Sequence, residues 1–332
     1  MPGTKYHAAL YGGYCFLSPS KTKNYVASVH QRLLNYARSS GQDFIFVLRT
    51  FAMERLLYRL SRSPYADNFV LKGAMLFKLW NGDFYRQTRD IDLLAFKSQT
   101  IDSLKAIFKD ICQISFFDDG LTYLSDTVKV EEIRENQQYG GYRVTLIAML
   151  GKAKIHLQVD CGFGDAITPE ASAHHFPTLL DFPAPRLRMY PKETVVAEKF
   201  EAIVKIGEAN SRMKDFYDLW VLGCDFSFSG AVLAMAIENT FNRRRTHFPI
   251  GSPEAFKTTF IQNPLKQTQW QAFVRKTRFV KVDKDFGKTI DLLRSFLLPP
   301  LESIQKSKSF KMTWPPNGPW QTSNLEGSPG MV

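Results

Sequence analysis

Residues 88–96 read TRDIDLLAF, an apolar segment that carries two aspartates. Ile91–Phe96 has the apolar, partly β-branched composition of a strand in a sheet core. Side chains alternate along a strand, so Asp90 and Asp92 are expected on one face, about 7 Å apart. Neighbouring carboxylates repel each other, and burying them without partners is costly. The stretch therefore predicts a strand whose acidic face needs compensation.

The size and composition of the chain limit its class. Its 332 residues are enough for two domains, and a hydrophobic content of 44% supports a sizeable core and excludes wholesale disorder. The formal net charge of +11, with a sequence pI near 9.4, favours a polyanionic partner such as nucleic acid.

The cysteines and the apolar segments bear on the cellular location. The four cysteines are far apart and show no CxxC spacing, which favours reduced thiols in a cytoplasmic protein, without a zinc site or a disulfide framework. No apolar run approaches 18 residues, so no membrane span is expected. The N-terminal segment lacks the pattern of a signal peptide.

Hydrophobic periodicity predicts an α+β first domain. Residues 1–24 show no period and are expected to form an extension. A helix begins near Tyr25, with Asn24 as its N-cap, and ends at Gly41; a second helix follows Asp43 as N-cap. The other predicted elements are strands at 69–71, 90–96, 127–134, 142–150 and 153–160 and helices at 75–80 and 101–113.

A proline-rich connection at 177–191 marks the boundary to a helical part. Helical spacing of apolar residues there predicts helices at 193–206, 212–222, 230–242, 253–261, 267–276 and 287–297. The tail is rich in Pro, Gly and Ser, so no regular structure is assigned to it. The expected domains are an extension at 1–24, an α+β domain at 25–185, a helical domain at 186–305 and an irregular tail at 306–332.

Small and acidic residues of the first domain occur in an order that suits nucleotidyl transfer. Gly73 and Ala74 follow a predicted strand and open a helix, where backbone N–H groups can approach phosphate oxygens. Asp90 and Asp92, joined by Asp160 from another strand, can hold Mg²⁺ and so relieve their repulsion. The alternative is that the aspartates are solvated or capping groups and that the glycine forms an ordinary turn.

A second charged cluster lies on two predicted helices of the helical domain. Asp215 and Asp218 are three residues apart, so their carboxylates share one helix face. In a functional interpretation, Lys199 binds a triphosphate as a compact positive charge, and Asp215 orients the lysine or the acceptor. The alternative interpretation is a charged surface with a few helix pairs.

Together these residues resemble the AbiEii/AbiGii toxin family of nucleotidyltransferases. Four ordered motifs carry the resemblance: Lys72-Gly73-Ala74, the R-x-T-x-D-I-D segment at 86–92, Ala197-Glu198-Lys199 with Ala202, and Arg212-x-Lys214-Asp215-x-x-Asp218. The similarity extends from about Tyr25 to the end of the helical domain. Ala74 departs from the Gly or Ser of the general nucleotidyltransferase turn, so a serine contact to phosphate is lost.

The resemblance implies a polymerase-β-like nucleotidyltransferase fold, a mixed β-sheet with flanking helices, followed by a helical C-terminal domain. It implies a toxin of a toxin–antitoxin or abortive-infection system, with a cognate antitoxin encoded nearby. It also implies Mg²⁺- or Mn²⁺-dependent transfer of a nucleoside monophosphate from an NTP to RNA, with the tRNA 3′ end as the expected acceptor. Two alternatives stay open: transfer to a protein hydroxyl, and a non-catalytic RNA- or partner-binding module.

The resemblance also implies roles for individual residues. The implied site comprises catalytic Asp90, Asp92, Lys199 and Asp215; nucleotide-binding Lys72, Gly73, Ala74 and Lys199; metal ligands Asp90, Asp92 and Asp160; and supporting Arg89, Lys214 and Asp218. Asp160 matches the third carboxylate of the wider superfamily, a position that the family does not use uniformly.

Two basic clusters of the helical domain suit an RNA acceptor, because cations neutralise phosphates and aromatic rings stack on bases. The clusters are Arg243-Arg244-Arg245, and Arg275, Lys276, Arg278 and Lys281 with Trp270, Phe273 and Phe279 interleaved. In the alternative interpretation the aromatic residues belong to the core and the cations form a solvated face.

Overall fold

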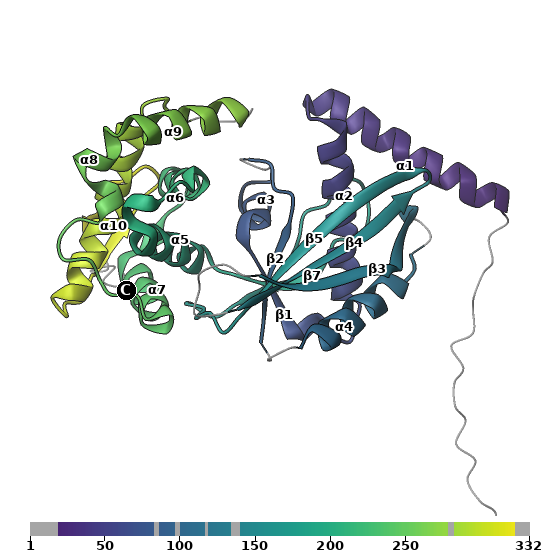
Figure 1. The fold of residues 1–332 in the computed structure, drawn as a ribbon, viewed down its shortest axis with the longest axis horizontal. Coiled ribbons are helices and arrows are strands. Elements are labelled where there is room, and N and C mark those ends of the chain that lie inside the picture. Colours follow the sequence, from purple (N-terminus) through teal and green to yellow (C-terminus); the bar gives the residue numbers. More distant parts are fainter. Residues whose placement is uncertain are drawn as a thin grey trace, which may run out of the picture.

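The computed structural model describes residues 19–82, 86–96, 100–116, 119–133, 140–277 and 282–322, with the backbone alone for 19–24 and Asn81. One half is a β-sheet with helices packed against it, and the other half, beside it, consists mainly of helices (Figure 1). The α+β class expected from the sequence is confirmed.

Seven strands form one mixed sheet in the order β3-β4-β5-β2-β1-β7-β6. Their bounds are β1 Phe69–Lys72, β2 Ile91–Ala95, β3 Leu121–Ile133, β4 Gly141–Leu150, β5 Ala153–Phe163, β6 Ser172–His175 and β7 Arg186–Met189. β2 runs parallel to β5, and β1 runs parallel to β7, whereas the other neighbours are antiparallel.

All five predicted strands are present, but their bounds differ in places. β3 begins six residues earlier than the predicted 127–134, because a register shift between Leu124 and Lys129 breaks its alternation. β6 and β7 are not among the predicted elements: all four residues of β6 are exposed, and β7 lies within the proline-rich connection at 177–191. β7 extends the sheet past residue 185, the expected end of the domain.

Helices α1 Pro19–Ser40, α2 Phe44–Ser61 and α4 Ile101–Gln113 belong to the sheet half. α2 packs against β5 and β7, and α4 against β3. Asp43 caps α2 as predicted, its carboxylate accepting from the Phe46 N–H at 3.0 Å. The prediction of Asn24 as N-cap of the first helix is wrong, because that helix begins at Pro19, a residue tolerated in a first turn.

The segment after β1 is what positions the site. β1 leads into a 3₁₀ turn, Gly73–Met75, and then the short helix α3 Leu76–Asn81. Lys72 lies opposite Asp92 in the register of β1 and β2, and Asp92 lies opposite Asp160 in that of β2 and β5. Neighbouring strands are about 4.8 Å apart, so these three residues form one row across the sheet.

Six α-helices dominate the other half. They are α5 Lys192–Ile206, α6 Met213–Asp225, α7 Gly230–Arg244, α8 Thr258–Ile261, α9 Pro264–Lys276 and α10 Phe286–Gln305. The predicted helix at 253–261 is instead a 3₁₀ turn, Glu254–Phe256, followed by α8. α5 packs against α6 and α7, and α10 covers both. None of the described helices has the length and apolar character needed to cross a membrane.

The prediction that residues 306–332 lack regular structure is wrong for two short segments. Strands β9 Met312–Trp314 and β10 Gln321–Thr322 pair with each other, and β9 pairs with β8 Phe228–Ser229. The Trp314 ring is buried, and its centroid lies 4.9 Å from that of the Phe296 ring on α10. This aromatic anchor holds the segment against the helices, although its composition is typical of a loop. Residues 323–332 lie outside the described part.

Candidate active site

Three carboxylates converge at the carboxyl-terminal part of β5 and the start of β2. Asp90 immediately precedes β2, Asp92 lies in β2, and Asp160 lies in β5. Each offers an oxygen atom that lies within 4.8 Å of the others, and all three side chains are partly accessible. The structure therefore brings together the three metal ligands expected from the sequence. We call this group the carboxylate triad.

The members of the triad differ in their surroundings. Thr88 donates a hydrogen bond to Asp90 at 2.9 Å. Asp160 accepts two hydrogen bonds from the Arg143 guanidinium, at 2.9 and 2.8 Å. Burial raises the pKa of Asp92 to about 6, and the neighbouring Asp90 carboxylate adds to this effect. Asp160 is therefore paired with a cation, whereas Asp90 and Asp92 form no ion pair with any described residue.

Gly73 lies directly against one of these carboxylates. Its φ is +74°, in the left-handed region, and a Cβ at this position would stand 1.9 Å from Oδ2 of Asp92. Only a glycine fits at position 73, because another residue would strain the left-handed backbone and its Cβ would clash with the Asp92 carboxylate. The turn predicted to approach a phosphate is thus held at the edge of the triad, while Ala74 beside it is buried.

The helical half contributes a cluster of paired charges. Lys199 on α5 lies 2.9 Å from Asp215 and 2.7 Å from Asp218, both on α6. Arg86 donates two hydrogen bonds to Asp218, at 2.7 and 2.8 Å. The positive charges of Arg86 and Lys199 lower the pKa of Asp218 to about 2, against the opposite effect of burial. Arg212 pairs with Asp215 at 2.8 Å. We call this group the lysine cluster.

Asp92 of the triad and several members of the lysine cluster line one pocket, of about 240 Å³. Asp92 and Gly73 line it from the sheet half, and Lys199 and Asp215 from the helical half. Its lining also includes Lys72, Ala74 and Lys214. Four of the residues predicted from the sequence do not line this pocket: Arg89, Asp90, Asp160 and Asp218.

Comparison with known proteins now adds to the geometry. A family model described as "Nucleotidyl transferase AbiEii toxin, Type IV TA system" matches residues 55–292. The chain belongs to the AbiEii family. It is therefore a nucleotidyltransferase of a toxin family, as the resemblance implied. No curated protein matches the sequence.

Two solved structures resemble this AbiEii family member, both from Helicobacter pylori. The protein JHP933 is 14% identical, with a TM-score of 0.46, over 79% of this chain and 94% of its own. A second protein, provisionally assigned as a nucleotidyltransferase, is 15% identical with a TM-score of 0.44, over 89% of this chain and 100% of its own.

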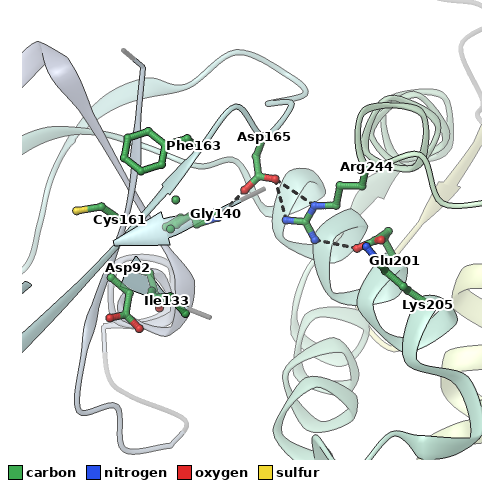
Figure 2. A pocket seen from close by; sticks show the side chains of 13 residues that line it. Asp92, Ile133, Gly140, Cys161, Phe163, Asp165, Glu201, Lys205 and Arg244 are labelled. Carbon is green, nitrogen blue, oxygen red and sulfur yellow. Dashed lines mark hydrogen bonds and ion pairs between the residues drawn. The ribbon is translucent and has the colours of Figure 1, made fainter. Parts of the chain in front are cut away.

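A second pocket, of about 150 Å³, shares Asp92 with the first and is lined by residues of both halves of this AbiEii chain, among them Asp160. Figure 2 shows Asp92 and Phe163 on its sheet side, and Glu201 and Lys205 on α5. Between them, Arg244 of α7 pairs with both Asp165, at 3.0 Å, and Glu201, at 2.8 Å (Figure 2).

Lys72 joins the same network of charges. Its ammonium group lies 2.8 Å from Asp165 and 3.4 Å from Glu198 on α5. Asp165 and Glu201 are not among the site residues predicted from the sequence, because neither belongs to one of the four motifs. Only the approach of β5 to α5 and α7 brings these residues together.

In the first basic cluster predicted for RNA, Arg244 is paired with Asp165 and Glu201, whereas Arg243 and Arg245 are exposed. Arg243 donates a hydrogen bond to the Gly164 carbonyl. A role of this cluster in RNA binding stays a prediction. In the second cluster Trp270 is fully buried and belongs to the core. Arg275 and Lys276 are exposed, whereas Arg278, Phe279 and Lys281 lie outside the described residues.

Proposed function

We propose that this protein transfers a nucleoside monophosphate from an NTP to an RNA acceptor, with the tRNA 3′ end as the expected acceptor. The observation that carries the proposal is the meeting of Asp92, Gly73 and Lys199 in one pocket. Nucleotidyl transfer needs negative charge to hold a divalent cation, and positive charge to hold phosphates. This pocket offers both on opposite walls.

The carboxylate triad fits a divalent cation such as Mg²⁺. The convergence of three carboxylate oxygens supports this, and the raised pKa of Asp92, caused by burial and by the neighbouring Asp90, is consistent with it. Asp90, Asp92 and Asp160 would hold the ion or ions, with Mn²⁺ as an alternative. When bound, such ions supply Lewis-acid polarisation of the transferred phosphoryl group and activation of the attacking hydroxyl.

The other residues act by binding and orienting. Asp215 and Asp218 fix the direction of the Lys199 ammonium group, which meets the triphosphate as a point charge. Gly73 leaves its backbone open to the phosphates beside Asp92. Lys72 and Lys214 add positive charge to the same pocket. Arg86 supports the cluster indirectly, by holding Asp218.

An antitoxin partner follows from the type IV toxin–antitoxin family. We propose that it is encoded nearby and that the toxin works in the cytoplasm, where its NTP and RNA substrates are found. Expressing the neighbouring reading frame together with the toxin should restore growth.

A labelling assay tests the proposed reaction. The purified protein, Mg²⁺ and total tRNA are incubated with each labelled NTP in turn, and label is expected on tRNA with at least one of them. The Asp90→Ala variant is expected to lose the labelling and the toxicity in a growth assay. Label on a protein would favour a hydroxyl acceptor in a side chain. Toxicity that survives both Asp90→Ala and Lys199→Ala would exclude catalysis as its cause.

A further inference from the structure

A groove of about 610 Å³ lies on the sheet, apart from both pockets of the active site. Its floor is formed by β3, β4 and β5, including Thr145 and Gln158, whose side chains are partly accessible. Arg49 from α2 and Arg89 from the segment before β2 line it as well. The groove therefore follows the face of the sheet on which the carboxylate triad lies.

The strand register connects the groove to the triad. Lys129, Thr145 and Gln158 lie opposite one another on β3, β4 and β5, in a row next to that of Asp160. The Gln158 amide donates to both oxygens of Asp160, at 3.2 Å each. Arg89 directly precedes Asp90 in the chain. Three steps between neighbouring strands, from β2 to β3, span about 14 Å.

The charges of the groove distinguish it from the rest of the site. Arg49, Arg89 and Lys129 make no ion pair with any residue that the structure describes. His156 is exposed beside them, and Asp126 is the acidic residue among the described lining. Cations within the site, such as Lys199 and Arg244, are held by carboxylates. Among the described lining residues the groove thus has three cations against one carboxylate, and its charge is net positive.

We propose that this groove, and not the basic residues of the helical half, binds the ribose-phosphate backbone of the acceptor RNA. The inference rests on the proposed function, because it assumes that the acceptor is RNA. Arg49, Lys129 and Arg89 bind phosphates along the approach to the triad, where the acceptor hydroxyl reacts. These contacts favour polyanions in general, so the binding depends strongly on salt and weakly on base sequence.

The test is a comparison of two charge-reversal variants of the full chain. One carries Arg49→Glu and Lys129→Glu in the groove; the matched control carries Arg275→Glu and Lys276→Glu at the exposed end of α9. Both change the net charge equally. Fluorescence anisotropy with 5′-labelled tRNA, without NTP, measures affinity at several salt concentrations. Labelling assays measure KM for tRNA and for the NTP.

The groove variant is expected to bind tRNA at least about tenfold more weakly. The slope of the logarithm of its binding constant against the logarithm of the salt concentration is expected to fall in magnitude by about 2, one unit for each lost phosphate contact. Its KM for the NTP is expected to stay unchanged, and the control variant to change affinity less than about twofold. Lys129→Glu alone, at an exposed position, should lower the slope by about 1. Thermal unfolding verifies that both proteins fold.

Two results would overturn the inference in different ways. If the wild type labels tRNA but the groove variant binds as tightly as the control, then the groove assignment fails and the proposed function stands. If the wild type neither binds nor labels tRNA, or labels a protein instead, then the proposed function fails and the groove assignment fails with it.

Discussion

The chain contains two buried clusters of charge that differ in what they leave open. In the sheet half, Arg55 and Arg59 of α2 share Asp119, at 3.2 and 2.6 Å. Both guanidinium groups also donate to backbone carbonyls, and all three side chains are at most 1% exposed. Aromatic rings, such as that of Tyr123, stack against the guanidinium groups. This cluster has no face toward a pocket of the active site.

The lysine cluster contains the same kinds of pairs, yet Lys199 lines a pocket. Its side chain keeps 14% exposure, whereas its partner Asp218 keeps 1%. The comparison separates two uses of buried charge. A cluster whose cations are almost fully buried away from the active site fixes helix to sheet, whereas one with a partly accessible cation in the proposed active site can also offer that charge to a ligand. Variants in each cluster should therefore fail in different assays.

The largest effect on stability is expected from Asp119→Ala. This variant leaves two buried guanidinium groups without their carboxylate, and breaking a buried pair costs about 3–5 kcal/mol. Denaturant unfolding, followed by circular dichroism, measures the change in the free energy of unfolding. Asp181→Ala, at an exposed position, serves as the control and should change it by less than about 0.5 kcal/mol. A loss below 1 kcal/mol for Asp119→Ala would contradict the structural role of the cluster.

Lys199→Met should have the opposite profile, with a small effect on stability and a large effect on activity. Arg86 and Arg212 remain beside the aspartates, so the free energy of unfolding should fall less than in Asp119→Ala. The rate of nucleotide transfer should fall roughly 10²–10³-fold, the usual cost of removing one group that stabilises developing charge. Single-turnover labelling measures this rate. Lys288→Met, an exposed position on α10, is the control. Full activity of Lys199→Met in a folded protein would remove the lysine from the proposed site.

A smaller, pH-dependent effect should come from Glu54, another buried charge of the sheet half. Burial raises the pKa of its carboxyl from 4.5 to about 7, although Lys78 lies 3.6 Å away. Because the folded protein binds this proton more tightly than the unfolded chain, the contribution to stability is complete below pH 4.5 and is lost as pH rises through 7. At 1.36 kcal/mol per pKa unit, the shift corresponds to about 3 kcal/mol.

Denaturant unfolding between pH 4.5 and 8 measures this contribution as the difference between the wild type and Glu54→Gln. The amide does not titrate, so the wild type should lose stability relative to the variant over this range. A constant difference between the two proteins would show that Glu54 has an ordinary pKa.

Local patterns were sufficient to predict that several residues of the candidate site lie close together. Strand alternation places Asp90 and Asp92 together, and helix periodicity places Asp215 and Asp218 on one face, because both follow from the spacing of neighbours along the chain. The pairing of Asp160 with Arg143 was not predictable in this way. It depends on the register of β4 and β5, which residue spacing alone does not determine.

The errors share one physical cause, contacts between residues far apart in the sequence. Arg244 stands in a basic triplet, yet its partners Asp165 and Glu201 are 79 and 43 residues away. The tail has the composition of a loop, but Trp314 finds a core formed by other segments. Composition reflects the local preference of a segment. The burial of Arg244 and of Trp314 depends instead on contacts with residues far away in the sequence.

The division of the site between the two halves affects when the protein can act. The carboxylates of β2 and β5 leave the ribosome well before Lys199. Asp165 can form its ion pair with Arg244 only after a further 79 residues have been synthesised. A nascent chain or a product of premature termination before α5 therefore has the carboxylate triad but no lysine cluster. Under the proposed mechanism, toxicity begins only after most of the chain has been translated, so a cell has that interval in which to supply the antitoxin.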